Sequence, residues 1–150
     1  MTSLPKHVLV VSCLIRNSRN QILLVKHHIR GWELPQGKVE EGEGLIFALC
    51  REVLEEAGVT ISHAKLAVVW SKVTPPATII FCFTARYASG ELTPSEETPE
   101  VRWCGEEDVE QWVSHPVNRE RIEALLKQHN TLQFRSYATG QPEPTRRQKL

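Results

Sequence analysis

The stretch that decides how this chain folds is GKVEEGEGLIFALCREVLEEAGV, which runs from Gly37 to Val59. Gly58 stands in the usual position for a helix stop. Before it, apolar residues recur every three or four positions, as they do on one face of a helix: Ile46, Leu49, Cys50, Val53 and Ala57. The pattern predicts an amphipathic helix over residues 44–57.

Three glutamates share another face of this predicted helix. Glu52, Glu55 and Glu56 lie three or four positions apart, where like charges destabilise an exposed helix. Negative charge near the helix C-terminus is also unfavourable. A solvated acidic face is one explanation. The other is a bound cation, because carboxylate oxygens are the ligands that Mg²⁺ and Mn²⁺ prefer.

Hydrophobic patterning predicts strands on both sides of this helix. They are expected at residues 7–15, 22–28, 64–73, 78–87 and 101–104, the first two as a hairpin. Residues 29–37 form a loop, residues 106–113 and 118–128 form two further helices, and residues 131–137 form a terminal edge strand. The fold class is therefore α/β in the loose sense, or α+β. Residues 1–137 make one domain, and residues 138–150 form a flexible C-terminal tail.

Composition indicates a soluble globular domain. The 18 Lys and Arg residues balance the 18 Asp and Glu residues, so no overall field favours nucleic acid or a membrane surface. No apolar run approaches the roughly eighteen residues of a membrane span, and no signal peptide is seen. The four cysteines never form a C-x-x-C pair, which favours packed, reduced thiols. A cytoplasmic location is expected.

The quoted stretch resembles the Nudix box, G-x5-E-x7-R-E-U-x-E-E-x-G-U, in which U is aliphatic. Every defined position of the box is matched: Gly37, Glu43, Arg51, Glu52, Val53, Glu55, Glu56, Gly58 and Val59. The WELPQG segment before the box and the strand order extend the resemblance over residues 6–137. It implies an α/β/α sandwich with a mixed central sheet. It also implies a hydrolase that uses Mg²⁺ or Mn²⁺ to cleave a nucleoside diphosphate linked to another group.

The resemblance assigns roles within the box. Glu52, Glu55 and Glu56 would bind the metal, together with the backbone carbonyl of Gly37. Glu52 would also help to deprotonate the attacking water. Arg51 would act at the catalytic helix, mainly through a salt bridge with Glu43 that orients the helix, although a direct phosphate contact is an alternative. Lys38 would face either phosphate or solvent.

A further metal-binding or catalytic carboxylate often comes from a loop downstream of the box. Residues 96–103 offer Glu96, Glu97 and Glu100. The resemblance favours Glu97, because it lies six residues before Trp103, as in members of the family that cleave nucleoside triphosphates. A polar loop residue without a catalytic role is the alternative.

Features outside the box bear on the substrate. Pro75 lies sixteen residues beyond Val59, where a proline is associated in the family with ADP-ribose hydrolysis, so ADP-ribose or a nucleotide sugar is the first expectation. Nucleoside triphosphates, oxidised ones included, and RNA 5′ ends are the alternatives. Trp32 is the aromatic residue expected at the rim of the site. A non-catalytic module that senses a nucleotide is an alternative of another class.

The expected partner is a small-molecule nucleotide. The absence of a long basic run argues against a nucleic-acid partner, and no membrane partner is expected. Homodimers occur among members of the family that this chain resembles, and a homodimer is one expectation.

Overall fold

The computed structural model describes residues 3–127, 130–139 and 146–148. The helices are α1 (Leu45–Ala57), α2 (Val109–Trp112) and α3 (Pro116–Leu126), and a 3₁₀ turn spans Glu106–Asp108. The strands are β1 (Val8–Arg16), β2 (Ile22–His27), β3 (Gly31–Glu33), β4 (Gln36–Lys38), β5 (Thr60–Lys72), β6 (Thr78–Ser89), β7 (Glu100–Cys104), β8 (Gln133–Tyr137) and β9 (Arg146–Gln148).

The strands form one mixed sheet in the order β3-β2-β1-β6-β5-β8-β9. β1 pairs with β6 in parallel over its whole length. Along its other edge it pairs with β4 near its start, where Val11 lies opposite Gly37, and with β2 only where Arg16 meets Ile22. The start of the Gly37–Val59 stretch is thereby fixed beside the central strand.

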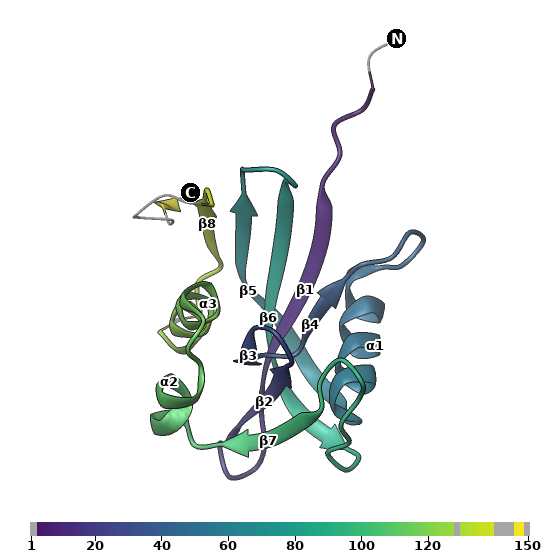
Figure 1. The fold of residues 1–150 in the computed structure, drawn as a ribbon, viewed down its shortest axis with the longest axis vertical. Coiled ribbons are helices and arrows are strands. Elements are labelled where there is room, and N and C mark those ends of the chain that lie inside the picture. Colours follow the sequence, from purple (N-terminus) through teal and green to yellow (C-terminus); the bar gives the residue numbers. More distant parts are fainter. Residues whose placement is uncertain (1–2, 128–129, 140–145, 149–150) are drawn as a thin grey trace.

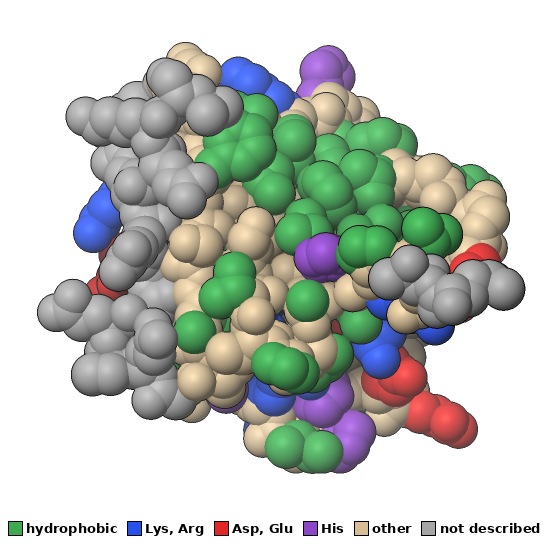
Figure 2. All heavy atoms as spheres, turned by 90° about the horizontal axis from the view of Figure 1, so that it is seen from above, with side chains coloured by type: hydrophobic (Ala, Val, Ile, Leu, Met, Phe, Trp, Pro, Cys, Tyr) green, Lys and Arg blue, Asp and Glu red, His purple; other side chains and the backbone are tan. Residues whose placement is uncertain are grey.

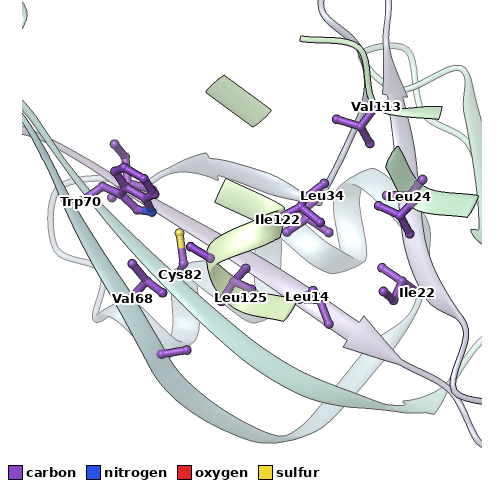
Figure 3. Packing of buried hydrophobic residues seen from close by; sticks show 14 of the residues in the cluster. Leu14, Ile22, Leu24, Leu34, Val68, Trp70, Cys82, Val113, Ile122 and Leu125 are labelled. Atoms are coloured by element: carbon purple, nitrogen blue, oxygen red, sulfur yellow. The ribbon is translucent and has the colours of Figure 1, made fainter. Parts of the chain in front are cut away.

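Helices cover both faces of the sheet, α1 on one and α2 and α3 on the other (Figure 1). Because successive side chains of a strand point to opposite faces, β1 contributes to two hydrophobic clusters. Val11, Cys13 and Ile15 pack on the α1 side, and Leu14 packs on the α3 side. Figure 3 shows Leu14 in this second cluster, with Ile122 and Leu125 of α3 among its members. The predicted α/β/α sandwich is confirmed.

Helix α1 lies rotated relative to the predicted apolar stripe. Its buried residues are Ala48, Leu49, Val53, Glu56 and Ala57. Ile46 is 51% exposed and Cys50 is exposed, so the prediction was wrong at these two positions. Relative to the predicted stripe, the buried face is turned toward Glu56 and leaves Cys50 outside it, and Ile46 lies in the first turn of the helix. Glu56 therefore lies within the buried face and Glu52 is half-buried beside it, whereas Glu55 stays exposed.

The other departures from the predicted elements are local. The loop expected over residues 29–37 contains the three-residue strand β3 and the first two residues of β4. Strand β8 is not at an edge, because it pairs with β5 on one side and β9 on the other. The tail predicted for residues 138–150 lies largely outside the described residues. Within it, 146–148 form β9.

The surface carries mixed side chains. In the view from above, hydrophobic side chains gather into a patch, and the acidic side chains that are visible lie at the margins (Figure 2). In the part of the chain that the structure describes, no helix is both long and apolar enough to cross a membrane. Of the four cysteines, all free, only Cys50 is exposed.

Candidate active site

A cleft of about 530 Å³ opens where α1 faces β4. Its walls include Glu52 and Glu56 from α1, Gly37 and Lys38 from β4, and Glu97 from the loop before β7. The structure thus brings residues from the box and from the downstream loop to one place, although 41 positions separate Glu56 from Glu97 in the sequence.

Glu56 is the most deeply placed carboxylate of the cleft. The residue is only 5% exposed, and the backbone N–H of Gln36 donates a 2.7 Å hydrogen bond to it. Burial raises the pKa of Glu56 to about 8, and the nearby carboxylates of Glu52, Glu33 and Glu97 also raise it. A carboxylate that is desolvated and surrounded by like charges favours any cation that enters the cleft.

Glu52 lies directly against the backbone of Gly37. A Cβ atom at position 37 would collide with the Glu52 carboxylate, so only glycine leaves room for that side chain. Partial burial raises the pKa of Glu52, and the hydrogen bond from Arg51 opposes this effect. The first position of the box therefore requires glycine because the Glu52 carboxylate lies against its backbone.

Arg51 braces the helix from its solvent side. Its Nε and Nη2 donate to the two oxygens of Glu43 at 2.6 and 2.7 Å, and Nη2 also donates to the carbonyl oxygen of Lys38. Nη1 donates to Glu52 at 2.9 Å and to Glu55 at 3.2 Å. The side chain of Glu55 is 59% exposed, so this carboxylate lies at the outer edge of the acidic group.

The loop that carries Glu97 is attached to the end of α1 by its neighbour. Thr98 is fully buried, and its hydroxyl donates to the carbonyl oxygen of Glu56 at 2.8 Å. The backbone N–H of Thr98 and the hydroxyl of Ser95 close the loop on itself. Sequence reasoning missed this anchor, because a threonine in a polar loop carries no pattern that marks it as buried.

A second polar network stands behind the cleft. Arg30 donates through Nε and Nη2 to both oxygens of Glu33, each at 2.8 Å, and Asn118 at the start of α3 donates to the same carboxylate at 2.9 Å. Glu33 is 1% exposed, so this carboxylate is buried with its acceptors satisfied. The hydrogen bond to Glu33 raises the pKa of Arg30 and keeps it charged at the cleft wall. No local pattern in the sequence marks this network, because Asn118 and Glu33 lie 85 positions apart.

Of the three predicted substrate contacts, one lines the cleft and two do not. Lys38 lies in the cleft wall. Trp32 does not line the cleft: it packs edge-to-face on Trp112 with ring centroids 5.5 Å apart, at the margin of the core. Pro75 is exposed in the turn between β5 and β6, and it does not line the cleft either.

The donors of this cleft suit a hard divalent cation. As the side chains stand, no three His, Cys, Asp or Glu residues in the described ranges converge into a metal site. Arg51 instead holds Glu52 and Glu55. Yet the available ligands are oxygens, two of the carboxylates are partly or largely desolvated, and the glycine at 37 leaves its backbone accessible beside Glu52. Oxygen donors of this kind match Mg²⁺ or Mn²⁺.

Sequence comparison connects this arrangement to known proteins. A family model described as the NUDIX domain matches residues 6–125. The 8-oxo-dGDP phosphatase NUDT18 of Homo sapiens is 37% identical over 92 residues, which are 59% of this chain and 28% of that protein. The NAD-capped RNA hydrolase NudC of Vibrio cholerae is 34% identical over 97 residues, 61% of this chain and 35% of that protein. The chain thus spans about a third of these relatives at most.

Solved structures agree with the family assignment. The MutT protein from Bacillus halodurans has a TM-score of 0.79 at 24% identity, covering 93% of this chain and 97% of that chain. A NUDIX hydrolase from Nitrosomonas europaea has a TM-score of 0.74 at 26% identity, covering 91% and 80%. The first shows the shared fold. Since the family model also matches well over half of the sequence, from its first strand into α3, the protein belongs to the Nudix hydrolase family.

Proposed function

We propose that this protein is a Mg²⁺- or Mn²⁺-dependent pyrophosphohydrolase that cleaves a nucleoside diphosphate linked to another group. One observation carries the proposal: the desolvated carboxylates of Glu52 and Glu56 share a cleft with Glu97, and Glu52 lies against the Gly37 backbone. Membership of the Nudix family supports the reaction class.

Each residue has a proposed role. Glu52, Glu55, Glu56, Glu97 and the Gly37 carbonyl would hold the metal. When bound, the cation would offset charge on the diphosphate and favour ionisation of water. Glu52 would accept a proton from the attacking water. Arg51 would act through Glu43 to set the position of α1, since its guanidinium is engaged by three carboxylates of this chain. Lys38 would contact phosphate.

The substrate belongs to the same proposal. ADP-ribose or a nucleotide sugar is the first proposed substrate class, because Pro75 stands where a proline is associated with ADP-ribose hydrolysis in the family. Oxidised guanine nucleotides are the second class, because relatives with 35% to 37% identity are 8-oxo-dGDP phosphatases. RNA 5′ ends enter as a third class through the relative that acts on NAD-capped RNA. The buried free thiols of Cys13, Cys82 and Cys104 favour a reducing compartment, and we propose the cytoplasm.

A substrate panel tests the function directly. It contains ADP-ribose, a nucleotide sugar, 8-oxo-dGDP, 8-oxo-dGTP and NAD-capped RNA, each with Mg²⁺ or Mn²⁺, and release of phosphate or nucleotide is measured. The Glu56→Gln variant should lower the rate on the substrate that is turned over by about 10²-fold or more. Glu41→Gln removes an exposed glutamate from the same stretch and serves as the control.

The panel also separates an enzyme from a non-catalytic sensor. A sensor would bind nucleotide without releasing product from any member of the panel. If the Glu56→Gln variant turns over its substrate at the wild-type rate, the proposed metal site is wrong, whereas the family assignment is unaffected.

A further inference from the structure

A second cavity, of about 330 Å³, adjoins the catalytic cleft on the side of α3. The two share Val10, Arg30 and Gln36, so a molecule with its diphosphate at the glutamates can extend across Gln36 into this cavity. Its walls come from β1, β4, β5, β6, β8 and the start of α3. Nothing in the catalytic proposal uses this space.

Within the described part of the chain, two cations of the cavity wall, Arg121 and Lys72, form no ion pair with an Asp or Glu side chain. Arg121 donates from Nη1 to the side-chain oxygen of Gln36 and from Nη2 to the Tyr137 hydroxyl, each at 3.1 Å. Both acceptors are neutral, so they orient the guanidinium without offsetting its charge. The Nε of Arg121 is buried and has no acceptor among the described residues. Lys72 donates from Nζ to the carbonyl oxygens of Pro75 and Pro76, each at 3.4 Å.

The remaining lining reinforces this positive character. Among the residues that the structure describes, no Asp or Glu side chain lines the cavity, and Glu33 nearby is already bound by Arg30 and Asn118. The hydroxyls of Tyr137 and Thr139 add polar groups that can donate to an anion. Neutral acceptors only partly replace the hydration that a half-buried cation loses, and an anionic ligand would supply the missing counter-charge.

We propose that this cavity binds a third phosphate of the substrate, beyond the two that the cleaved bond joins, and that Lys72 and Arg121 select for it. The inference rests on the proposed function and narrows its substrate class to phosphorylated nucleotides. The third phosphate can sit on the sugar of the nucleotide or at the end of a longer phosphate chain. Arginine and lysine are the residues that bind phosphate most directly, through charge-assisted hydrogen bonds.

Binding without turnover tests this selection. In metal-free buffer, dissociation constants are measured by calorimetry for pairs that differ by one phosphate. AMP against adenosine 2′,5′-bisphosphate and adenosine 3′,5′-bisphosphate is the sugar arm, and ADP against ATP is the chain arm. The added phosphate should tighten binding about tenfold or more in one arm. That arm identifies where the third phosphate sits.

Substitutions assign the effect to the cavity. Lys72→Met keeps the length of the side chain without its charge, and it should reduce the preference within the pair to near unity, as should Arg121→Met. Lys72→Arg should retain the preference. Lys65→Met removes an exposed lysine from the same strand and should leave every dissociation constant unchanged.

The outcomes separate the two proposals. Equal binding within every pair, binding of no member of any pair, or a preference that survives in both Met variants would overturn the assignment of the cavity. Absence of turnover with Mg²⁺ or Mn²⁺, despite a preference that depends on Lys72, would instead overturn the proposed hydrolase activity. Turnover of a phosphorylated substrate with a KM that rises in Lys72→Met supports both.

Discussion

The Arg51 guanidinium holds the Glu43 carboxylate through two hydrogen bonds, 2.6 Å from Nε and 2.7 Å from Nη2. This contact joins the loop before α1 to the solvent side of the helix that carries the acidic cluster. The hydrogen bonds from Arg51 and then the backbone N–H of Glu40 lower the pKa of Glu43 from 4.5 to about 2.

The first prediction concerns this pair and pH. Because the folded-state pKa of Glu43 is lowered, its contribution to stability is complete above about pH 4.5 and is lost as the pH falls toward 2. Glu43→Gln should therefore unfold at lower urea concentration than wild type at pH 7, and the difference should shrink below pH 4.5. Glu41→Gln should match wild type throughout. A difference that is constant with pH would contradict the ion pair.

The second prediction concerns Gly37. An alanine there would push the Glu52 carboxylate aside, and since the obstructing atoms are the end of a flexible side chain, the fold should persist. The rate should fall by about 10²-fold, because small displacements of a reacting group have effects of this size. Steady-state kinetics and circular dichroism on Gly37→Ala check both parts. Gly44→Ala, with open space around the added methyl group, should retain activity.

The third prediction concerns metal addition. A cation that binds only the folded state should stabilise it by about 2.7 kcal/mol at a concentration of 100 times its dissociation constant. Differential scanning fluorimetry should show a melting temperature that rises with Mg²⁺ or Mn²⁺ and returns to the starting value with EDTA. In Glu56→Gln the rise should be reduced. An equal rise in both proteins would place the bound metal elsewhere.

The fourth prediction concerns the network behind the cleft. Removing the amide of Asn118 leaves the buried Glu33 carboxylate one donor short. Asn118→Ala should lower the free energy of unfolding by about 1–3 kcal/mol, the cost of an unsatisfied buried polar group. Arg119→Ala, which truncates an exposed residue on the same helix, is the matched control in urea unfolding. Equal losses in the two variants would contradict the role of Asn118.

Much of the fold could be predicted from periodicity. The long strands and both longer helices follow from apolar spacing, because each buries a continuous face. The three-residue strands β3 and β4 have no such pattern, since their pairing depends on the distant strands β2 and β1. Helix spacing also could not show that α1 turns its glutamate side toward the core, because Ile46 and Leu49 look alike in a sequence.

The candidate site was predictable where its spacing is local. Glu52 and Glu56 fall within one turn of one helix, and the box marks them. Glu97 could be placed only through the family resemblance, and it does line the cleft. Contacts between Gln36 and Arg121, or Glu33 and Asn118, join residues 85 positions apart. No local pattern encodes such pairs, so the second cavity could not be predicted.

The exposure of Cys50 has a practical consequence. Burial raises the pKa of Cys13 and Cys104, and that of Cys82 to about 12, which keeps those thiols protonated and shielded from reagents. A maleimide dye would therefore attach at Cys50, one residue before Arg51 on the outer side of α1. The native protein thus already carries a single attachment point for a spectroscopic probe, from which rearrangement of Arg51 on metal binding can be followed in solution without engineering the chain.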